Sequence, residues 1–189
     1  MKINKGIPSL LCAIGIYVLS VDVYAAPDIS FAISNNTIQT NQAFTIDVLA
    51  SSVDSLDELI AFGFNTVHDA TWTLDSVTIG SGFDDNSGLF ANTAVAGSAF
   101  PSGPSGNNIL LATLQFTAST AGHFNFGIAS NLTNPNEGLF LLNETDAFDL
   151  THSQSVTVNA VPVPAAVWLF GSALAGFMGM KRRKNGLAV

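Results

Sequence analysis

Apolar side chains recur at every second position in several short segments of this chain. The clearest segments are 29–33, 44–48, 60–64 and 124–128, and 156–158 repeats the pattern over a shorter length. A period of two puts alternate side chains on opposite faces of an extended backbone. Each segment therefore predicts a strand with one buried face.

Less regular apolar segments between these strands predict further strands, and turn residues separate them. Residues 35–36, 121–122 and 134–136 are typical turns, whereas only 53–59 hints at a helical turn. Eight or nine short strands with few helical windows predict an all-β domain, an antiparallel β-sandwich or jelly roll, over residues 26–160. About 135 residues bury roughly two-thirds of their unfolded surface, which is enough for a core without disulfides. The less regular segments are 72–74, 77–79, 109–116 and 139–142.

The basic residues lie only near the two ends of the chain. All six Lys and Arg residues lie within 2–5 or 181–184, the 14 carboxylates lie between Asp22 and Asp149, and the formal net charge is -8. A domain without a cation cannot neutralise phosphates or release their counterions, which excludes binding to nucleic acids. It also excludes binding to acidic lipid surfaces, except at the two ends.

The first 25 residues predict a signal peptide. Two lysines near the N-terminus precede an apolar run at 10–21, and small residues lead to an expected cut by signal peptidase between Ala25 and Ala26. The apolar run is too short to span a bilayer comfortably. Cys12, the single cysteine, lies within this segment. The mature chain is therefore expected to have no disulfide and no cysteine-based catalytic or metal site.

A second apolar segment lies near the C-terminus, where residues 165–180 are uncharged. As a helix they would span roughly 24 Å, slightly less than the ~30 Å of a hydrocarbon core. Basic clusters stay on the cytoplasmic side, and the four basic residues that follow would leave the β-domain outside the cytoplasm. The sequence thus predicts a transmembrane helix at about 165–180, and the alternative is a C-terminal core helix. The predicted membrane stop comprises Lys181, Arg182, Arg183 and Lys184.

Residues 161–189 resemble a known class of sorting tails. Their motif, apolar helix and basic end follow in the order of the PEP-CTERM class, in its Val-Pro-Leu-Pro-Ala (VPLPA) variant, with Val163 in place of the usual leucine. The resemblance implies an exosortase-type transpeptidase of Gram-negative bacteria, which cuts near the motif and transfers the protein outside. Proteins of this class often accompany exopolysaccharide and biofilm loci. Two prolines just outside a helix keep the backbone extended, as an enzyme active site requires. The motif comprises Val161, Pro162, Val163, Pro164 and Ala165.

A second, broader resemblance covers most of residues 28–158. Four successive segments, 41–48, 59–65, 72–80 and 109–118, are similar in strand pattern and spacing to the cohesin-like module. That module is a nine-stranded jelly-roll sandwich related to carbohydrate-binding domains, and cohesins hold partner proteins called dockerins through one sheet face. No position here matches a diagnostic contact motif, so the resemblance implies a fold without naming contact residues.

The longest irregular stretch, residues 80–108, holds six glycines and two prolines. A connection of this length is uncommon in a compact domain and is typical of a binding or lid loop, or of a disordered segment. Leu89-Phe90 and Val95 are candidates to dock it as a short strand. Its phenylalanines are either anchors to the core or exposed groups that stack on a ligand. These candidates are Phe83, Phe90 and Phe100.

Calcium is the one cofactor that the sequence leaves open. Asp84, Asp85 and Asn86 precede Gly88 and supply oxygen ligands beside a turn. Position twelve of an EF-hand loop would be Val95, so that motif fails, and a calcium site in a loop of the sandwich is the alternative. No other cofactor is expected.

Signals for an enzyme are weak in this sequence. His68, His123 and His152 have no paired spacing, and there is no Gly-x-Ser-x-Gly elbow. Glycoside cleavage would need two acids at a defined separation across a cleft. The acids near the predicted loops are better interpreted as solvated charge, so the chain is predicted not to be an enzyme. Those acids are Asp75, Asp84, Asp85, Asp146 and Asp149.

These features together predict an exported binding module. It is expected to be anchored at the inner membrane with its domain outside the cytoplasm, and then sorted to the cell surface or the extracellular matrix. There it would hold a polysaccharide or a partner protein. Two other classes stay open: a structural matrix protein without a discrete ligand, and a secreted hydrolase.

Overall fold

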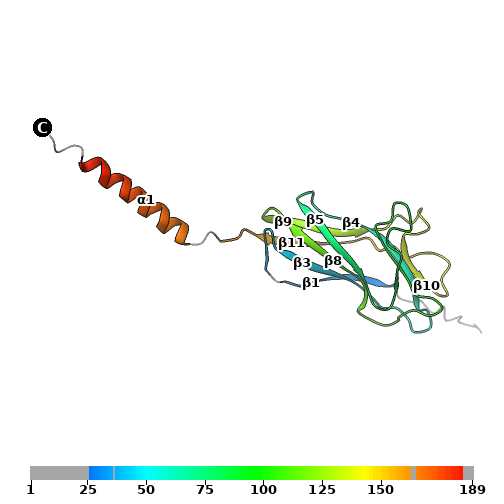
Figure 1. Ribbon diagram of the computed structural model, residues 1–189. Helices are drawn as coiled ribbons and strands as arrows, with labels where there is room; N and C mark the ends of the chain where they lie inside the picture. Colours follow the sequence, from blue (N-terminus) through cyan, green and yellow to red (C-terminus); the bar gives the residue numbers. More distant parts are fainter. Residues whose placement is uncertain (1–25, 36, 163–164, 185–189) are drawn as a thin grey trace, which may run out of the picture.

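The computed structural model of the chain describes residues 26–35, 37–162 and 165–184 (Figure 1). The predicted signal peptide with Ala25, and Val163 and Pro164 of the sorting motif, lie outside the described residues. Within the described ranges the chain forms eleven strands and one helix. The expectation of an all-β domain followed by a helix is therefore confirmed.

Four strands form the first sheet, each antiparallel to its neighbours. In their order across the sheet they are β1 (Asp28–Ile33), β3 (Ala43–Ser51), β8 (Ile109–Ala118) and β5 (Trp72–Ile79). The alternation seen in the sequence is present in β3, where Phe44, Ile46 and Val48 are buried and Thr45 and Asp47 are only half-buried. One face of this sheet therefore contributes to the core and the other faces solvent.

The second sheet contains the other seven strands. Six of them lie in the order β2 (Ile38–Gln39), β11 (His152–Asn159), β9 (Gly122–Ala129), β4 (Leu59–Val67), β7 (Val95–Ser98) and β6 (Asp84–Asp85), and β10 (Gly138–Leu141) pairs with β4. All of these pairs are antiparallel except β2 with β11, which is parallel. A β-sandwich is thus confirmed, with more strands than the eight or nine expected.

Aromatic rings fill the space between the two sheets. Phe44 and Trp72 of the first sheet meet edge to face with ring centroids 5.2 Å apart. Phe116 of β8 meets Phe126 of β9 at 5.5 Å, which joins the two sheets directly. Each buried ring removes a large apolar area from water, so this cluster is a principal source of the stability of a domain without disulfides.

Two short segments differ from the sequence expectation. Residues 72–74 and 77–79, predicted as separate strands, belong to the single strand β5, whose irregular pairing with β8 interrupts the alternation. Segment 53–59 contains a turn and no helix, with the amide of Asp57 donating to the carbonyl oxygen of Asp54 at 3.1 Å.

The irregular stretch 80–108 contains two strands, β6 and β7. Val95 begins β7, as one of the docking candidates predicted, whereas Leu89 lies in a turn and is 71% exposed. β7 was not visible as an alternating segment because Val95, Ala96 and Gly97 are all buried. A strand buried on both faces shows no period of two.

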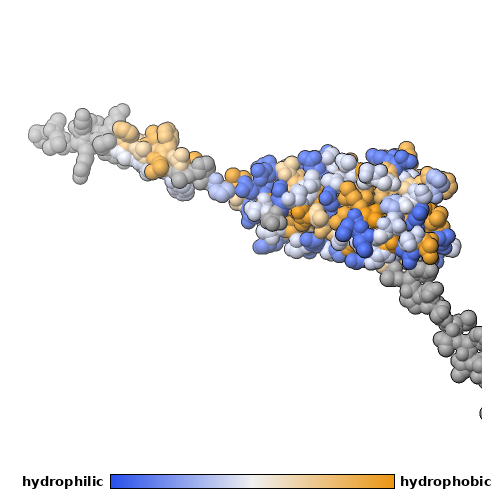
Figure 2. Space-filling model, turned by 90° about the horizontal axis from the view of Figure 1, so that it is seen from below, coloured by the Kyte–Doolittle hydropathy of each residue, from blue (hydrophilic) through white to orange (hydrophobic). Residues whose placement is uncertain are grey.

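Helix α1 (Ala165–Lys184) projects from one end of the sandwich (Figure 1). It begins where the sequence predicts a helix and continues through the basic cluster. Its apolar side chains are exposed, including Trp168 at 76% and Phe177 at 69%, and hydrophobic colouring covers much of it in Figure 2. No helix in the described part of the chain, α1 included, is both long enough and apolar enough to cross a membrane.

Candidate binding site at the end of the sandwich opposite the helix

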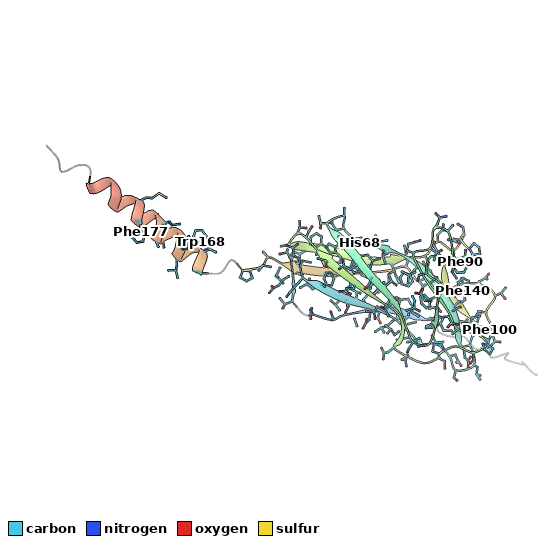
Figure 3. The ribbon with its side chains drawn as sticks, in the orientation of Figure 1. His68, Phe90, Phe100, Phe140, Trp168 and Phe177 are labelled. Atoms are coloured by element: carbon cyan, nitrogen blue, oxygen red, sulfur yellow. The ribbon has the colours of Figure 1, made fainter. Side chains whose placement is uncertain are left out.

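The stretch 80–108 and strand β10 meet at the end of the sandwich opposite α1. Figure 3 shows Phe90, Phe140 and Phe100 together at this end, while Trp168 and Phe177 lie on the helix at the other. The three phenylalanines singled out in the sequence have different environments there. Their two alternative roles, as core anchor or as exposed group, can therefore be assigned residue by residue.

Phe83 is an anchor, and Phe100 is an exposed group. The ring of Phe83 is half-buried and meets the ring of Phe62 edge to face, with centroids 5.0 Å apart. Phe100 is 83% exposed, the most exposed aromatic side chain in the described part of the chain. Phe90 is also exposed, but less so, at 38%.

Phe83 and Phe100 line one shallow pocket of about 200 Å³, which Phe90 does not reach. The wall is otherwise made of small and polar residues, with a single carboxylate. We call this cavity the Phe100 pocket. Its lining residues are Ser81, Gly82, Phe83, Asp84, Ser98, Ala99, Phe100 and Ser102.

The segment that carries Phe100 is fixed to β4 and to the turn before it. On one side the amide of Ala99 donates to the carbonyl oxygen of Ile60 at 2.7 Å. On the other side the amide of Gly103 donates to the Glu58 carboxylate at 3.0 Å. A Cβ at Gly103 would collide with the carbonyl oxygen of Leu59, so a close backbone approach needs glycine there. Phe100 thus projects from a short segment that is anchored on both sides.

Strand pairing places a row of side chains next to the pocket. Phe140 of β10 lies opposite Ala61 of β4, Ala61 lies opposite Ser98 of β7, and Ser98 lies opposite Asp84 of β6. Residues in register on neighbouring strands share a face, so the row runs from Phe140 to the pocket. The sequence analysis did not select Phe140, because nothing local to 139–142 indicates that this segment pairs with β4.

The calcium candidates lie on and beside β6. Asp84 faces the Phe100 pocket, Asp85 Oδ1 accepts the amide proton of Ser87 at 2.8 Å, and Asn86 Nδ2 donates to Ser98 Oγ at 2.6 Å. Among the described residues, no three His, Cys, Asp or Glu side chains are grouped so that they could hold a metal ion. The calcium site stays a prediction.

A second polar cluster, missed in the sequence, surrounds the buried carboxylate of Glu137. Glu137 is only 3% exposed. Its Oε1 accepts hydrogen bonds from Asn65 Nδ2 and Asn134 Nδ2, both at 2.9 Å, and its Oε2 accepts the amide proton of Asn131 at 2.7 Å. Buried charges need such partners. Since they come from β4 and from the 131–137 turn, the cluster attaches that turn to the sheet.

The three histidines have separate local contacts. His68 Nδ1 lies 3.1 Å from the carbonyl oxygen of Asp69, His123 Nδ1 lies 2.9 Å from Thr157 Oγ1, and the ring of His152 packs against Phe31 at 4.9 Å. No histidine has a hydrogen bond to a serine or an acidic side chain within the residues that the structure describes.

Asp149 connects two loops through hydrogen bonds to its carboxylate. Its Oδ1 accepts hydrogen bonds from Ser130 Oγ at 2.7 Å and from the amide of Thr151 at 2.8 Å. The pKa of Asp149 is lowered from 3.8, chiefly by the hydrogen bond from the Thr151 side chain and then by that from Ser130. A carboxyl whose folded pKa is depressed adds stability that is present above its unfolded pKa and is lost as the pH falls through the folded value.

We therefore expect Asp149→Asn to be less stable than the wild-type chain at neutral pH, and the difference to shrink below pH 3.8. Urea unfolding of both chains at a series of pH values measures this. The exposed Asp146 provides the control, because Asp146→Asn removes the same charge in the same loop. If the difference in unfolding free energy between Asp149→Asn and the wild type were the same at acid pH as at neutral pH, the role assigned to Asp149 would be contradicted.

The comparisons with known proteins concern the fold. A cohesin module from a family 33 glycoside hydrolase of Clostridium perfringens matches with a TM-score of 0.56 at 12% identity, over 71% of this chain and 98% of that module. The seventh ScaB type I cohesin from Pseudobacteroides cellulosolvens matches with 0.47 at 13% identity, over 73% and 95%. A type I cohesin–dockerin complex from Clostridium thermocellum matches with 0.44 at 11% identity, over 69% and 99%.

No protein-family model matches the chain, and no curated protein matches it in sequence. The fold is therefore established by structure, at an identity too low to transfer a ligand or a contact residue. This chain has the β-sandwich fold of a cohesin module.

Proposed function

We propose that this protein is an exported binding module that holds a polysaccharide or a partner protein at the bacterial cell surface or in the biofilm matrix. The observation that carries the proposal is Phe100, an 83% exposed aromatic side chain on an anchored segment beside a pocket. It lies at the end of the sandwich opposite α1 (Figure 3), so a module tethered through its tail would present this end outward.

The tail supports export and sorting. Apolar side chains are exposed along α1 from Val167 to Met178, and an exposed apolar surface of this extent needs a cover that the sandwich does not provide. We propose that the inner membrane provides it before processing, with Lys181–Lys184 as the stop, and that an exosortase-type transpeptidase then cuts near 161–165. Signal peptidase would remove residues 1–25.

The mass of the protein from native cells tests this processing. We expect residues 1–25 to be missing in all cells, and the residues after the sorting motif to be missing only where the sorting transpeptidase is present. Residues 6–180 contain no Lys or Arg, so trypsin leaves the processed module as one fragment for weighing. A full-length product free in the cytoplasm, with both ends intact, would contradict the proposal.

Binding is tested by retention of native matrix on the immobilised protein. We expect the wild-type chain to retain a polysaccharide or a protein from the extracellular matrix of its own cells. Retention of the same material by heat-unfolded protein would indicate non-specific binding. If the folded chain retains nothing, the second candidate, a structural matrix protein without a discrete ligand, is favoured.

The cohesin fold favours a protein as the ligand, because the cohesin resemblance of the sequence implies partner proteins. The Phe100 pocket favours a polysaccharide as the ligand, because its serine hydroxyl groups can hydrogen-bond to a sugar and the exposed phenylalanine ring can stack on it. The same retention experiment separates them, since protease digestion of the matrix before loading destroys only a protein ligand.

A further inference from the structure

The size of the Phe100 pocket limits what it can take. Its volume of about 200 Å³ lies below the ~300–1,000 Å³ of sites for drug-sized ligands. It is also shallow, so a ligand can extend beyond it. A single sugar ring within a longer chain has a suitable size.

Phe100 supplies an exposed apolar surface beside the pocket, on a segment whose backbone is anchored. The side chain is 83% exposed, yet its segment is anchored through Ala99 on one side and Gly103 on the other. A sugar ring carries C–H groups on its faces and hydroxyl groups around its edge. An exposed aromatic ring covers such a face with little loss of side-chain entropy, since phenylalanine has only two rotatable side-chain bonds.

The rest of the lining supplies hydrogen-bonding groups for the edge of the ring. Ser98 Oγ accepts a hydrogen bond from Asn86 Nδ2 at 2.6 Å, which leaves its own proton free to donate. Ser81 and Ser102 are exposed and present hydroxyl groups that both donate and accept. The exposed carboxylate of Asp84 adds a strong acceptor.

The charge around the pocket decides which sugars fit. Asp84 lines it, Asp85 follows in the same strand, and the Glu58 carboxylate binds the amide of Gly103 beside it. No Lys or Arg occurs between residues 6 and 180, so no cation of the domain can pair with an acidic sugar. Bringing a uronic acid or a sulfated sugar into this field would be opposed by like charge.

From these observations we infer that the Phe100 pocket binds one ring of a neutral polysaccharide, with Phe100 stacked on the face of the sugar. The inference rests on the proposed binding function and names its ligand class. Ser81, Ser98, Ser102 and Asp84 bond the hydroxyl groups at the edge of the ring. Acidic polysaccharides are excluded from the site.

Affinity electrophoresis of the full-length chain in detergent tests this, with native gels that contain laminarin, mannan or cellulose ether as neutral probes and alginate as the acidic probe. We expect at least one neutral probe to retard the protein, at low and at high salt, and alginate not to retard it. Failure of every neutral probe, or retardation by alginate at least as strong as by the neutral probes, overturns the inference.

Variants then locate the site. Loss of a stacked ring weakens binding by about tenfold or more, so Phe100→Ala is expected to abolish most of the retardation. Phe90→Ala is the matched control, because Phe90 lies in the same stretch but outside the pocket. It is expected to leave retardation unchanged. Retention of binding by Phe100→Ala overturns the assignment, and unchanged thermal melting shows that each variant folds.

Asp84→Asn distinguishes a sugar from a basic peptide. Asparagine keeps a hydrogen-bonding oxygen, so binding of a neutral sugar is expected to fall by only a few-fold and to remain insensitive to salt. If Asp84→Asn instead abolishes retention of a matrix protein by the immobilised chain, and high salt does the same, the pocket binds a cationic protein and the inference is overturned. In that case, as when the matrix experiment retains only a protein, the proposed binding function stands while the neutral-sugar site fails.

Discussion

Gly63→Ala is expected to lower the melting temperature of the sandwich by roughly 10 °C, which corresponds to about 3 kcal/mol of unfolding free energy. A Cβ at Gly63 would overlap the carbonyl oxygen of Asn136 and lie 3.2 Å from Thr93 Cγ2. The obstacle on the Asn136 side is backbone, so it cannot rotate away. It also cannot retreat freely, because the next residue, Glu137, is hydrogen-bonded in the buried cluster.

Calorimetry of the full-length chain measures this shift. Gly82→Ala is the matched control: a Cβ there would lie 3.5 Å from its nearest neighbour, Pro104 Cγ, which is ordinary contact. That variant is expected to melt within a few degrees of the wild type. If Gly63→Ala melted like Gly82→Ala, the turn at 131–137 would not lie against β4.

Glu137→Ala is expected to lower the unfolding free energy by about 3 kcal/mol. The carboxylate accepts three hydrogen bonds, and its removal takes away the partner of the Asn131 amide and one partner each of Asn65 Nδ2 and Asn134 Nδ2. Those two amide groups keep second hydrogen bonds to uncharged acceptors, Asn65 Nδ2 with Asn92 O at 2.8 Å and Asn134 Nδ2 with Thr93 Oγ1 at 3.2 Å. The loss is therefore smaller than if those two amide groups were left without any acceptor.

Two further variants test whether the loss of stability is specific to the hydrogen bonds of Glu137. Glu137→Gln keeps the volume but removes the charge and turns one acceptor into a donor, so it is expected to cost less than alanine and still more than about 1 kcal/mol. Glu144→Ala removes an exposed carboxylate and is expected to change stability by less than about 0.5 kcal/mol. Urea unfolding gives these values, and equal effects of Glu137→Ala and Glu144→Ala would refute the role of the cluster.

Much of the sandwich was predictable because its central strands are buried on one face only. The alternation of Phe44, Ile46 and Val48 directly reflects a strand with the core beneath it. Segment 139–142 was among the predicted strands and forms β10, whereas β7 was marked only by the candidate Val95, because its first three residues are all buried. Such strands form because β4 is already present to pair with them, and that pairing has no local signal.

The candidate site was predictable only in part. The composition of 80–108 predicted a binding or lid loop or a disordered segment, and its phenylalanines were candidates for core anchors or for exposed stacking groups. Which ring anchors and which is exposed depends on the distance to Phe62, which the sequence does not contain. Phe140 and Glu137 gained their positions from segments more than seventy residues away, Ala61 and Asn65.

The sequence by itself determined how charge is distributed along this protein, with cations only at the two ends and an acidic β-domain between them. It also contains a tail that resembles a sorting signal. The sequence also determined the strands that are buried on one face only, because a period of two is a local property of the chain. Only the tertiary structure decided that Phe83 turns to the core while Phe100 faces solvent beside three serines and an aspartate. That arrangement depends on contacts between distant strands, and these form only when the sheets pair and pack.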